Sequence, residues 1–254
     1  MATQKKTVFI TGATAGFGEA MARRFAAAGH SLVLTGRRAD RLAKLKNELK
    51  VPVHMLQLDV RDRKAVEQAA AALPDAFKAV DVLINNAGLA LGLEPAHKVN
   101  MDDWEQMVDT NVKGLLYVTR ALLPGMVERD RGHVVNLGSV AGTYPYPGGN
   151  VYGGTKAFVH QFSLNLRADL IGSKVRVTSV EPGMAETEFS VVRFKGDSSK
   201  AKDVYKGLQP MTPDNIAQTI EFITTILPEH VNINTIEMMP VMQAFGAFAV
   251  KREG

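Results

Sequence analysis

The sequence contains no cysteine among its 254 residues. This absence excludes disulfide bonds, thiolate catalysis and cysteine-bound metals. No apolar run approaches the roughly 18 residues of a membrane span, or the roughly 7–15 residues of a secretory signal. We therefore expect a cytoplasmic protein without a membrane segment.

The excess of positive over negative charge is also small, since the net charge is only +4. No dense basic run with interleaved aromatic residues is present, so we do not expect nucleic-acid binding. The six histidines show no metal-ligand spacing, and we expect no metal. The apolar content of 46% is ordinary for a globular chain that buries its own core.

Short apolar runs alternate with helical patterns along the whole chain, and most of these runs are continuous, as in strands covered on both faces. The expected strands are Thr7–Thr11, Ser31–Thr35, Val53–Leu58, Val80–Ile84, Gly132–Leu137, Val175–Val180 and Ile233–Met238. The expected helices are Phe17–Ala28, Ala39–Leu49, Arg63–Leu73, Met101–Glu128, Val151–Ile171 and Asp214–Ile226. This alternation predicts an α/β fold, a Rossmann-like doubly wound parallel sheet of about seven strands with helices on both faces.

One polar segment interrupts the alternation, from Thr187 to Met211, between the sixth strand and its helix. Long excursions of this kind are uncommon in compact domains and are often functional lids. No Pro/Gly/Ser-rich linker or internal repeat is present. We expect one domain over residues 1–254, with a substrate lid at about 187–211 and a tail at 240–254.

A glycine-rich loop follows the first expected strand and reads Thr11-Gly12-Ala13-Thr14-Ala15-Gly16-Phe17-Gly18. Glycines at this spacing permit a tight turn and let a pyrophosphate approach the backbone at a helix N-terminus. The loop is neither the G-x-G-x-x-G fingerprint nor a Walker loop, and it could serve only close packing. As a dinucleotide site it would present Gly12, Thr14, Gly16, Phe17 and Gly18.

The second expected strand ends in Thr35-Gly36-Arg37-Arg38. NAD sites usually place an acid here for the ribose, whereas NADP sites use an arginine for the 2′-phosphate. Gly36 stands in place of the acid, and a guanidinium fork suits a phosphate dianion. Arg37 and Arg38 could instead be surface residues at a helix start. With the glycine loop upstream, the pattern favours NADP(H).

Tyr152 and Lys156 lie four residues apart on an expected helix, and so on one face of it. A nearby cation favours tyrosinate, and lowering its pKa by ~3 units takes about 4 kcal/mol. Tyr152 could then exchange a proton with a carbonyl oxygen. Ser139 follows the fifth strand, at the sheet edge where ligands bind. Its surroundings, Gly138-Ser139-Val140-Ala141-Gly142, are not the elbow of a serine hydrolase.

Together these motifs resemble the short-chain dehydrogenases/reductases. The family's motifs are matched in order by Gly12-x-x-x-Gly16-x-Gly18, Asn85-Asn86-Ala87-Gly88, Asn111, Ser139, Tyr152-x-x-x-Lys156 and Pro182-Gly183-x-x-x-Thr187. They extend over nearly the whole chain. The resemblance therefore implies an NADP-dependent oxidoreductase.

The resemblance also implies a role for each matching residue. Tyr152 would be the general acid/base, Lys156 would hold the nicotinamide ribose and lower the Tyr152 pKa, and Ser139 would orient the carbonyl. Asn111 would anchor a water in the proton relay. Further cofactor contacts would come from Asp59 and Val60 at the adenine, from Asn86, Ala87 and Gly88 beside the cofactor, and from Pro182, Gly183 and Thr187 at the nicotinamide.

Three further segments are similar to one subgroup of this family: Ala87–Gly92, Pro145–Tyr152 and Asn232–Pro240. The subgroup comprises NADP-dependent 3-hydroxy acid (serine or allo-threonine) dehydrogenases, malonic semialdehyde reductases and sulfoacetaldehyde reductases. It implies a small acidic aldehyde or hydroxy acid as substrate. The turn Gly183–Thr187 differs, with Ala185-Glu186 where the hydroxy acid dehydrogenases are richer in glycine. That difference leaves sulfoacetaldehyde open.

An acidic substrate needs a polar or cationic partner. Arg193 in the expected lid is our candidate, with Lys195 as the alternative cation and Gln243 as a further hydrogen-bond donor if the tail folds back or crosses to a neighbouring subunit. Tyr144 and Tyr146 could line the pocket or pack beneath it. Arg193 could also be a solvent-facing residue on a mobile lid.

Two other functions remain open, a reductase of neutral or bulkier carbonyls and an NADP-binding sensor without turnover. A sensor would have no chemical need for Asn111, Ser139, Tyr152 and Lys156 together. The family resemblance also implies a homotetramer, formed through the helices expected at Met101–Glu128 and Val151–Ile171.

Overall fold

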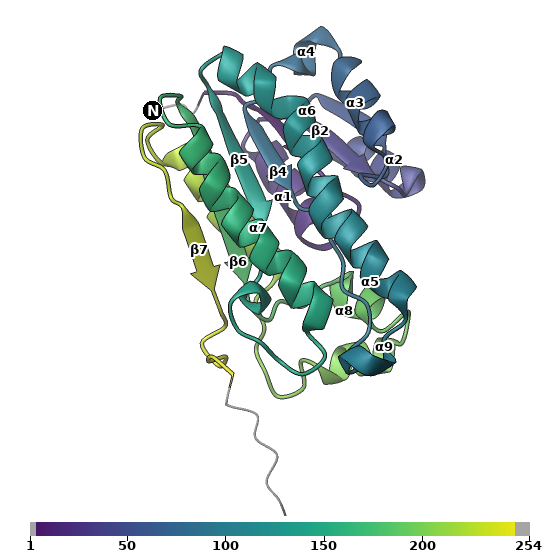
Figure 1. The fold of residues 1–254 in the computed structure, drawn as a ribbon. Helices are drawn as coiled ribbons and strands as arrows, with labels where there is room; N and C mark the ends of the chain where they lie inside the picture. The colour runs from purple at the N-terminus through teal and green to yellow at the C-terminus, as the bar shows by residue number, and fades with distance from the viewer. Residues whose placement is uncertain (1–3, 247–254) are drawn as a thin grey trace, which may run out of the picture.

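The computed structural model describes residues 4–246 and contains one sheet of seven parallel strands (Figure 1). The strands are β1 (Thr7–Ile10), β2 (Ser31–Gly36), β3 (Val53–Gln57), β4 (Val82–Asn85), β5 (Gly132–Leu137), β6 (Val175–Pro182) and β7 (Thr235–Met238). They are ordered β3-β2-β1-β4-β5-β6-β7. The predicted doubly wound fold is therefore confirmed, with strand ends shifted by at most two residues.

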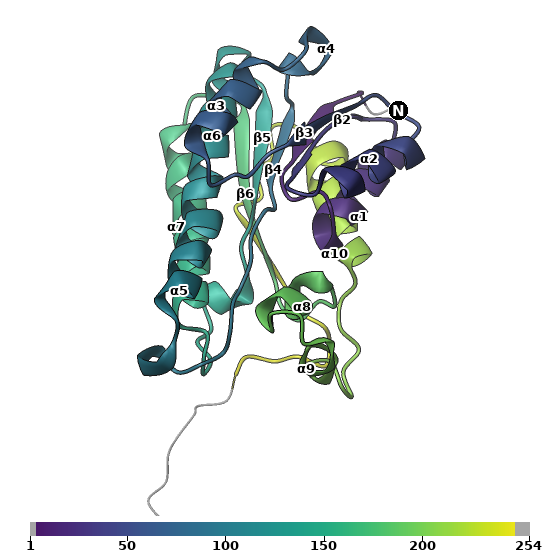
Figure 2. The same ribbon diagram turned by 90° about the vertical axis from the view of Figure 1, so that its right-hand side faces the viewer.

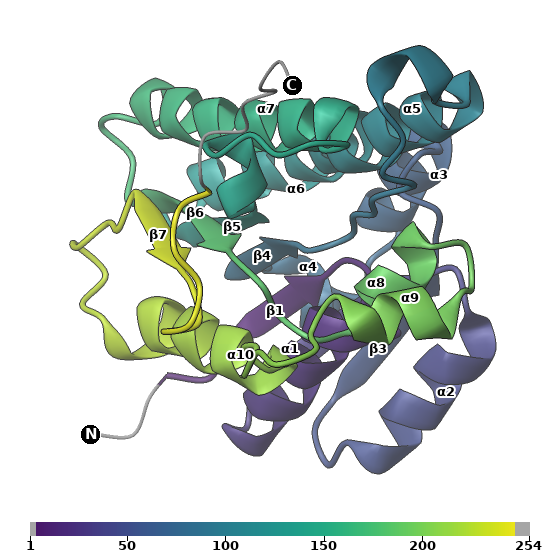
Figure 3. The same cartoon turned by 90° about the horizontal axis from the view of Figure 1, so that it is seen from below.

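Helices cover both faces of this sheet (Figures 2 and 3). The α-helices are α1 (Gly16–Ala27), α2 (Ala39–Glu48), α3 (Arg63–Ala71), α4 (Asp75–Lys78), α5 (Met101–Val108), α6 (Leu115–Glu128), α7 (Asn150–Asp169), α8 (Glu188–Arg193), α9 (Ser198–Asp203) and α10 (Pro213–Glu221). Helices α4, α8 and α9 were not predicted, because four to six residues are too few to display a helical period. The helix predicted at Met101–Glu128 is interrupted by a π-helical segment, Asp109–Gly114.

Side-chain alternation along the strands divides the core into two layers. Val8 and Ile10 face α1, α2 and α10, whereas Phe9 between them belongs to the layer under α3, α6 and α7. Figure 3 shows the two groups of helices on opposite sides of the sheet. This alternation follows from the period of two in a strand. Because both faces are covered, the free surface of the sheet is limited to its edges.

The sheet itself is therefore open to ligands at the ends of its strands. The strand order reverses direction between β1 and β4, where the two crossovers leave a crevice at the carboxyl edge. Helices α8 and α9 lie beyond that edge (Figures 1 and 2). The segment that contains them is closed at its base, because Ala185 and Met211 form a parallel bridge. No helix in the described part of the chain is long and apolar enough to cross a membrane.

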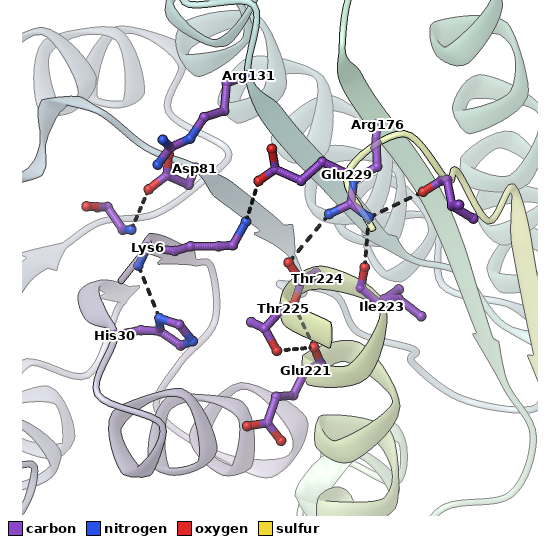
Figure 4. Close-up of polar contacts among 12 residues, drawn as sticks. Lys6, His30, Asp81, Arg131, Arg176, Glu221, Ile223, Thr224, Thr225 and Glu229 are labelled. Atoms are coloured by element: carbon purple, nitrogen blue, oxygen red, sulfur yellow. Dashed lines mark hydrogen bonds and ion pairs between the residues drawn. The ribbon is translucent and has the colours of Figure 1, made fainter. Parts of the chain in front are cut away.

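The amino edge carries a polar network instead (Figure 4). The buried Arg176 guanidinium donates to the carbonyl oxygens of Ile223, Thr224 and Val231, which satisfies acceptors left open at a helix end. The Lys6 ammonium pairs with Glu229 at 3.1 Å. These contacts fasten the C-terminal part of the fold at the edge opposite the crevice.

Gly18 gives a test of how tightly the first crossover is packed. A Cβ atom at this position would overlap the Gly12 carbonyl oxygen and lie 2.9 Å from the Ala13 Cα, so backbone would have to move. We expect Gly18→Ala to lower the free energy of unfolding by about 1–3 kcal/mol, as overpacking does. Urea titration would measure the loss.

The matched control is Gly154→Ala on α7, where an added Cβ meets nothing within 4 Å. This variant should keep or slightly raise the stability, since alanine favours a helix. Equal stability of the two variants would contradict the packing argument.

Candidate active site at the carboxyl edge of the sheet

A cleft of about 340 Å³ lies at the carboxyl edge, over the β1/β4 reversal. Sixteen of the seventeen residues that the sequence predicts for the cofactor line it: Gly12, Thr14, Gly16, Phe17, Arg37, Arg38, Asp59, Val60, Asn86, Ala87, Gly88, Tyr152, Lys156, Pro182, Gly183 and Thr187. Gly18 does not line the cleft. Its missing side chain lets α1 start directly against the Gly12 carbonyl, and a cofactor contact at Gly18 stays a prediction.

The loop after β1 is shaped by glycines in left-handed backbone conformations. Gly12 and Gly16 have φ angles of 66° and 53°, which residues with a Cβ rarely adopt. The loop is tied to the end of β4, where Thr11 Oγ1 accepts from the Asn86 and Ala87 amides, at 2.9 Å each. The N-cap residue of α1 is an alanine and makes no side-chain cap. The first N–H groups of α1 therefore suit an anion.

The end of β2 leaves little space for an acidic side chain at Gly36. A Cβ there would lie 2.7 Å from the Thr14 Cγ2. The Thr14 hydroxyl instead accepts from Arg38, whose Nε and Nη2 lie 3.1 and 2.9 Å away. The site therefore offers a held guanidinium in place of a carboxylate, and Arg37 lines the same end of the cleft.

Tyr152, Lys156 and Ser139 gather at the other end of the cleft. The Lys156 Nζ lies 5.8 Å from the centre of the Tyr152 ring and donates to the Leu137 carbonyl at 2.6 Å. The Ser139 hydroxyl accepts from the Ala141 amide and donates to the Pro182 carbonyl. Carbonyl groups at the ends of β5 and β6 thus hold Lys156 and Ser139, and α7 places Tyr152 beside them.

The charge state of Tyr152 differs from the expectation of a lowered pKa. Burial raises the pKa of Tyr152 to about 12, and the opposing effects of Arg193 and Ser139 do not offset it. Burial also lowers the pKa of Lys156 to about 8, against the pull of Glu181. Since the Lys156 ammonium is bound to a carbonyl, it does not act as the close partner of the phenol. Tyr152 is consequently a neutral acid in this structure.

Asn111 lies within the π-helical segment and is buried. Its side chain is fully engaged, because Oδ1 accepts from the Leu89 amide while Nδ2 donates to the Leu89 carbonyl and to Thr155 Oγ1. It does not line the cleft. π-Helical turns inside helices are frequent at functional sites and release backbone groups from the regular ladder. Sequence periodicity could not detect this one-residue insertion.

Arg193 lies at the end of α8, against Tyr152. Its guanidinium carbon is 5.1 Å from the centre of the Tyr152 ring, 5.2 Å from that of Phe189 and 6.0 Å from that of Tyr146. The Tyr146 hydroxyl accepts from Nη2 at 3.2 Å. The buried Nε has no hydrogen-bond partner among residues 4–246. Arg193 does not itself line the cleft, although Phe189 of the same helix does. A guanidinium held on three rings with an unpaired donor suits an anionic group beside Tyr152.

The other substrate candidates have other partners. Lys195 pairs with Asp103 at 2.7 Å. The Gln243 Oε1 accepts from the Met184 amide, so this part of the tail folds back on its own subunit beside Gly183, while residues 247–254 lie outside the described residues. Tyr144 donates to Glu237 and packs on Phe245, away from Arg193.

The turn Gly183–Thr187, which differs from the subgroup in sequence, lies at the edge of the cleft. Ala185 lines the cleft, whereas Glu186 is exposed and does not. Glu186 therefore gives no reason to exclude an anionic substrate. Among residues 4–246, no three His, Asp or Glu side chains gather as metal ligands.

Several cleft residues were not predicted, notably Leu89, Thr110, Glu188, Phe189 and Val192. The last three belong to α8, whose N-cap Thr187 accepts from the Phe189 amide at 3.0 Å. A threonine followed by a glutamate in the first turn is a helix-start signal, so the sequence did contain a hint of α8.

Comparisons with known proteins agree with this geometry. The family model for short chain dehydrogenases matches residues 6–197. An NADP-dependent 3-hydroxy acid dehydrogenase of Salmonella typhi is 60% identical over 96% of this chain and 99% of its own length. A serine 3-dehydrogenase of Agrobacterium fabrum is 55% identical over 97% of this chain and 98% of its own length.

A solved structure described as the closed form of serine dehydrogenase complexed with NADP⁺ superimposes with a TM-score of 0.95. It is 56% identical, over 97% of this chain and all of the other. A family match over most of the chain, relatives well above 30% identity and the site geometry lead to one conclusion. This chain belongs to the short-chain dehydrogenase family.

Proposed function

We propose that this protein catalyses the reversible, NADP(H)-dependent reduction of a small acidic aldehyde to its hydroxy acid, equivalently the oxidation of 3-hydroxy acids such as serine. The observation that carries the acidic specificity is Arg193, which lies against the Tyr152 ring and whose buried Nε has no hydrogen-bond partner in the part of the chain that the structure describes. The names of the similar proteins support a hydroxy acid substrate.

The residues present fit NADP(H). Arg37 and Arg38 would hold the 2′-phosphate, the uncapped start of α1 the pyrophosphate, and Lys156 the nicotinamide ribose. The bound cofactor supplies or accepts the hydride, and the protein orients it. The lack of space for an acid at position 36 supports NADP(H) over NAD(H).

The raised pKa of Tyr152 suits the reductive direction. With a pKa of about 12, the phenol keeps its proton at neutral pH and can give it to a developing alkoxide. Ser139 lies in the same part of the cleft, where its hydroxyl would orient the carbonyl oxygen. Because the Asn111 side chain is engaged, its backbone at the π-helical turn would anchor the water that returns a proton through Lys156.

Arg193 would bind the acid group at the far end of the substrate. A carboxylate, as in malonic semialdehyde, and a sulfonate, as in sulfoacetaldehyde, both present oxygens to a guanidinium fork.

We also propose that residues 187–211 act as a lid over this site. We further propose that the protein is a homotetramer built through α5, α6 and α7, where Phe158 and Phe162 stack near the surface.

Removing the Tyr152 hydroxyl tests the general acid. We expect Tyr152→Phe to lose at least ~100-fold in turnover, since general acid/base catalysis supplies about 10²–10⁴. NADPH affinity, measured by fluorescence titration, should stay within about 2-fold, because the ring remains. Tyr144→Phe, outside the cleft, is the control. Near-normal turnover of Tyr152→Phe would refute the assignment.

The arginines after β2 test cofactor choice. We expect the double variant Arg37→Ala/Arg38→Ala to raise the Kd for NADPH by roughly 10–100-fold, since hydrogen bonds to charged groups contribute about 1.5–3 kcal/mol. The Kd for NADH, which lacks the phosphate, should change by less than about 3-fold. Arg63→Ala on exposed α3 is the control. An equal loss for both cofactors would argue against 2′-phosphate recognition.

The acid-binding role of Arg193 is tested by comparing two substrates. We expect Arg193→Ala to lower kcat/KM for an acidic aldehyde by ~10-fold or more, about 1.4 kcal/mol. An uncharged aldehyde of similar size should lose much less. Lys206→Ala, which removes an exposed cation from the same segment, should leave the ratio unchanged. Equal losses for the two aldehydes with Arg193→Ala would show that Arg193 does not bind the acid.

A further inference from the structure

Helix α8 joins the two ends of the cleft. Its first residue, Glu188, lies beside the arginines that follow β2, and its last, Arg193, lies on Tyr152. Six residues of helix span roughly 9 Å, so the element is a short strut between the two ends. A displacement of one end of α8 would therefore move the other.

The Glu188 carboxylate makes three contacts across to α2 and the turn before it. Arg41 Nη1 lies 2.8 and 2.9 Å from its two oxygens, and Arg38 Nη1 lies 3.2 Å from one of them. Partial burial raises the pKa of the Glu188 carboxyl, but hydrogen bonds from Arg41 and Arg38 outweigh it and the net pKa is lowered. Glu188 is thus charged at neutral pH.

Arg41 and Arg38 contribute differently to this contact. Arg38 lines the cleft and also donates to Thr14, so a bound 2′-phosphate would share its charge. Arg41 does not line the cleft, and it makes the two shorter contacts. The pair between Arg41 and Glu188 can therefore persist whether or not Arg38 turns to a phosphate.

Other contacts also fasten the segment. Lys195 pairs with Asp103, the Arg193 carbonyl accepts from the Gly92 amide at 2.9 Å, and Tyr205 donates to the Ala185 carbonyl at the base. Glu188 is the residue of α8 that pairs with arginines across the cofactor end of the cleft.

We propose that Glu188 is a positioning residue, which fastens α8 to α2 through Arg41 and Arg38 and so sets Arg193 over Tyr152 for binding of the acidic substrate. This inference rests on the proposed acid-binding role of Arg193. Its consequence is that a surface ion pair at the cofactor end determines substrate affinity at the catalytic end.

Glu188→Gln keeps the shape of the side chain and removes its charge. We expect the KM for malonic semialdehyde to rise about 3- to 5-fold, consistent with exposed ion pairs, while kcat stays within about 2-fold. The KM for propionaldehyde, an uncharged substrate, should not change. The control is Glu186→Gln, which removes the neighbouring exposed charge and should behave as the wild type.

A double-mutant cycle tests whether the pair itself is responsible. Arg41→Ala alone should raise the KM for malonic semialdehyde as Glu188→Gln does, and the double variant should add little to either. Additive effects, or an unchanged KM in Glu188→Gln, would overturn the proposal. A fall in kcat equal to the rise in KM would point to general damage and would also overturn it.

Trypsin gives a readout that is independent of the reaction. The segment carries Lys195, Lys200, Lys202 and Lys206. Cleavage at these lysines, identified by mass spectrometry, should be several-fold faster in Glu188→Gln and Arg41→Ala than in Glu186→Gln. Unchanged cleavage would show that Glu188 does not hold the segment, even if Arg193→Ala had confirmed acid binding. Faster cleavage without any change in the KM for the substrate would show that Glu188 holds the segment but would overturn the proposal that it positions Arg193.

Discussion

The reversal of strand order between β1 and β4 is the constraint on which the rest of this structure depends. The chain winds in opposite directions from these two strands, and the loops that leave them separate at the carboxyl edge. Thr11 and Asn86 join the two loops by hydrogen bonds at the floor of the resulting crevice. Because both faces of the sheet are covered by helices, polar side chains from distant parts of the sequence meet at the ends of the strands, and at the carboxyl edge they surround an open cleft.

The two ends of the cleft that forms there differ in their electrostatics. At the cofactor end, partly exposed arginines offer positive charge to a phosphate, and Thr14 holds one of them in place. At the catalytic end, burial dominates and keeps Tyr152 protonated despite a nearby guanidinium. A neutral phenol beside a cation suits the reaction proposed here, in which the phenol gives a proton to the carbonyl oxygen of a substrate that also carries an acidic group. Helix α8 contacts both ends.

Much of this was predictable because the chemistry depends on strand ends. Continuous apolar runs locate the strands, and residues immediately after them, such as Gly12, Asn86 and Ser139, must then lie at one edge. The helical spacing of Tyr152 and Lys156 likewise fixes their common face. The sequence therefore indicates most of the residues that line the cleft. The packing role of Gly18 could not be predicted, because it depends on the three-dimensional approach of α1 to Gly12.

What could not be predicted depends on contacts between segments distant in the sequence. The pKa of Tyr152 follows from burial, to which Phe189 and Arg193 of α8 contribute, and a helix of six residues has no detectable period. The π-helical turn at Asn111 is a one-residue insertion in a pattern that otherwise reads as one helix. Lys195 is paired with Asp103 and Arg193 is not paired with a carboxylate in the described residues, a difference between two neighbouring cations that only the folded chain reveals.

The central claim is that a site built for proton donation also selects an acidic substrate. The most direct test is NADPH oxidation by the purified wild-type protein with malonic semialdehyde, sulfoacetaldehyde and an uncharged aldehyde of similar size. We predict that one acidic aldehyde exceeds the uncharged one by ~10-fold or more in kcat/KM, about 1.4 kcal/mol of transition-state discrimination. Equal kcat/KM values for the charged and uncharged aldehydes would contradict it.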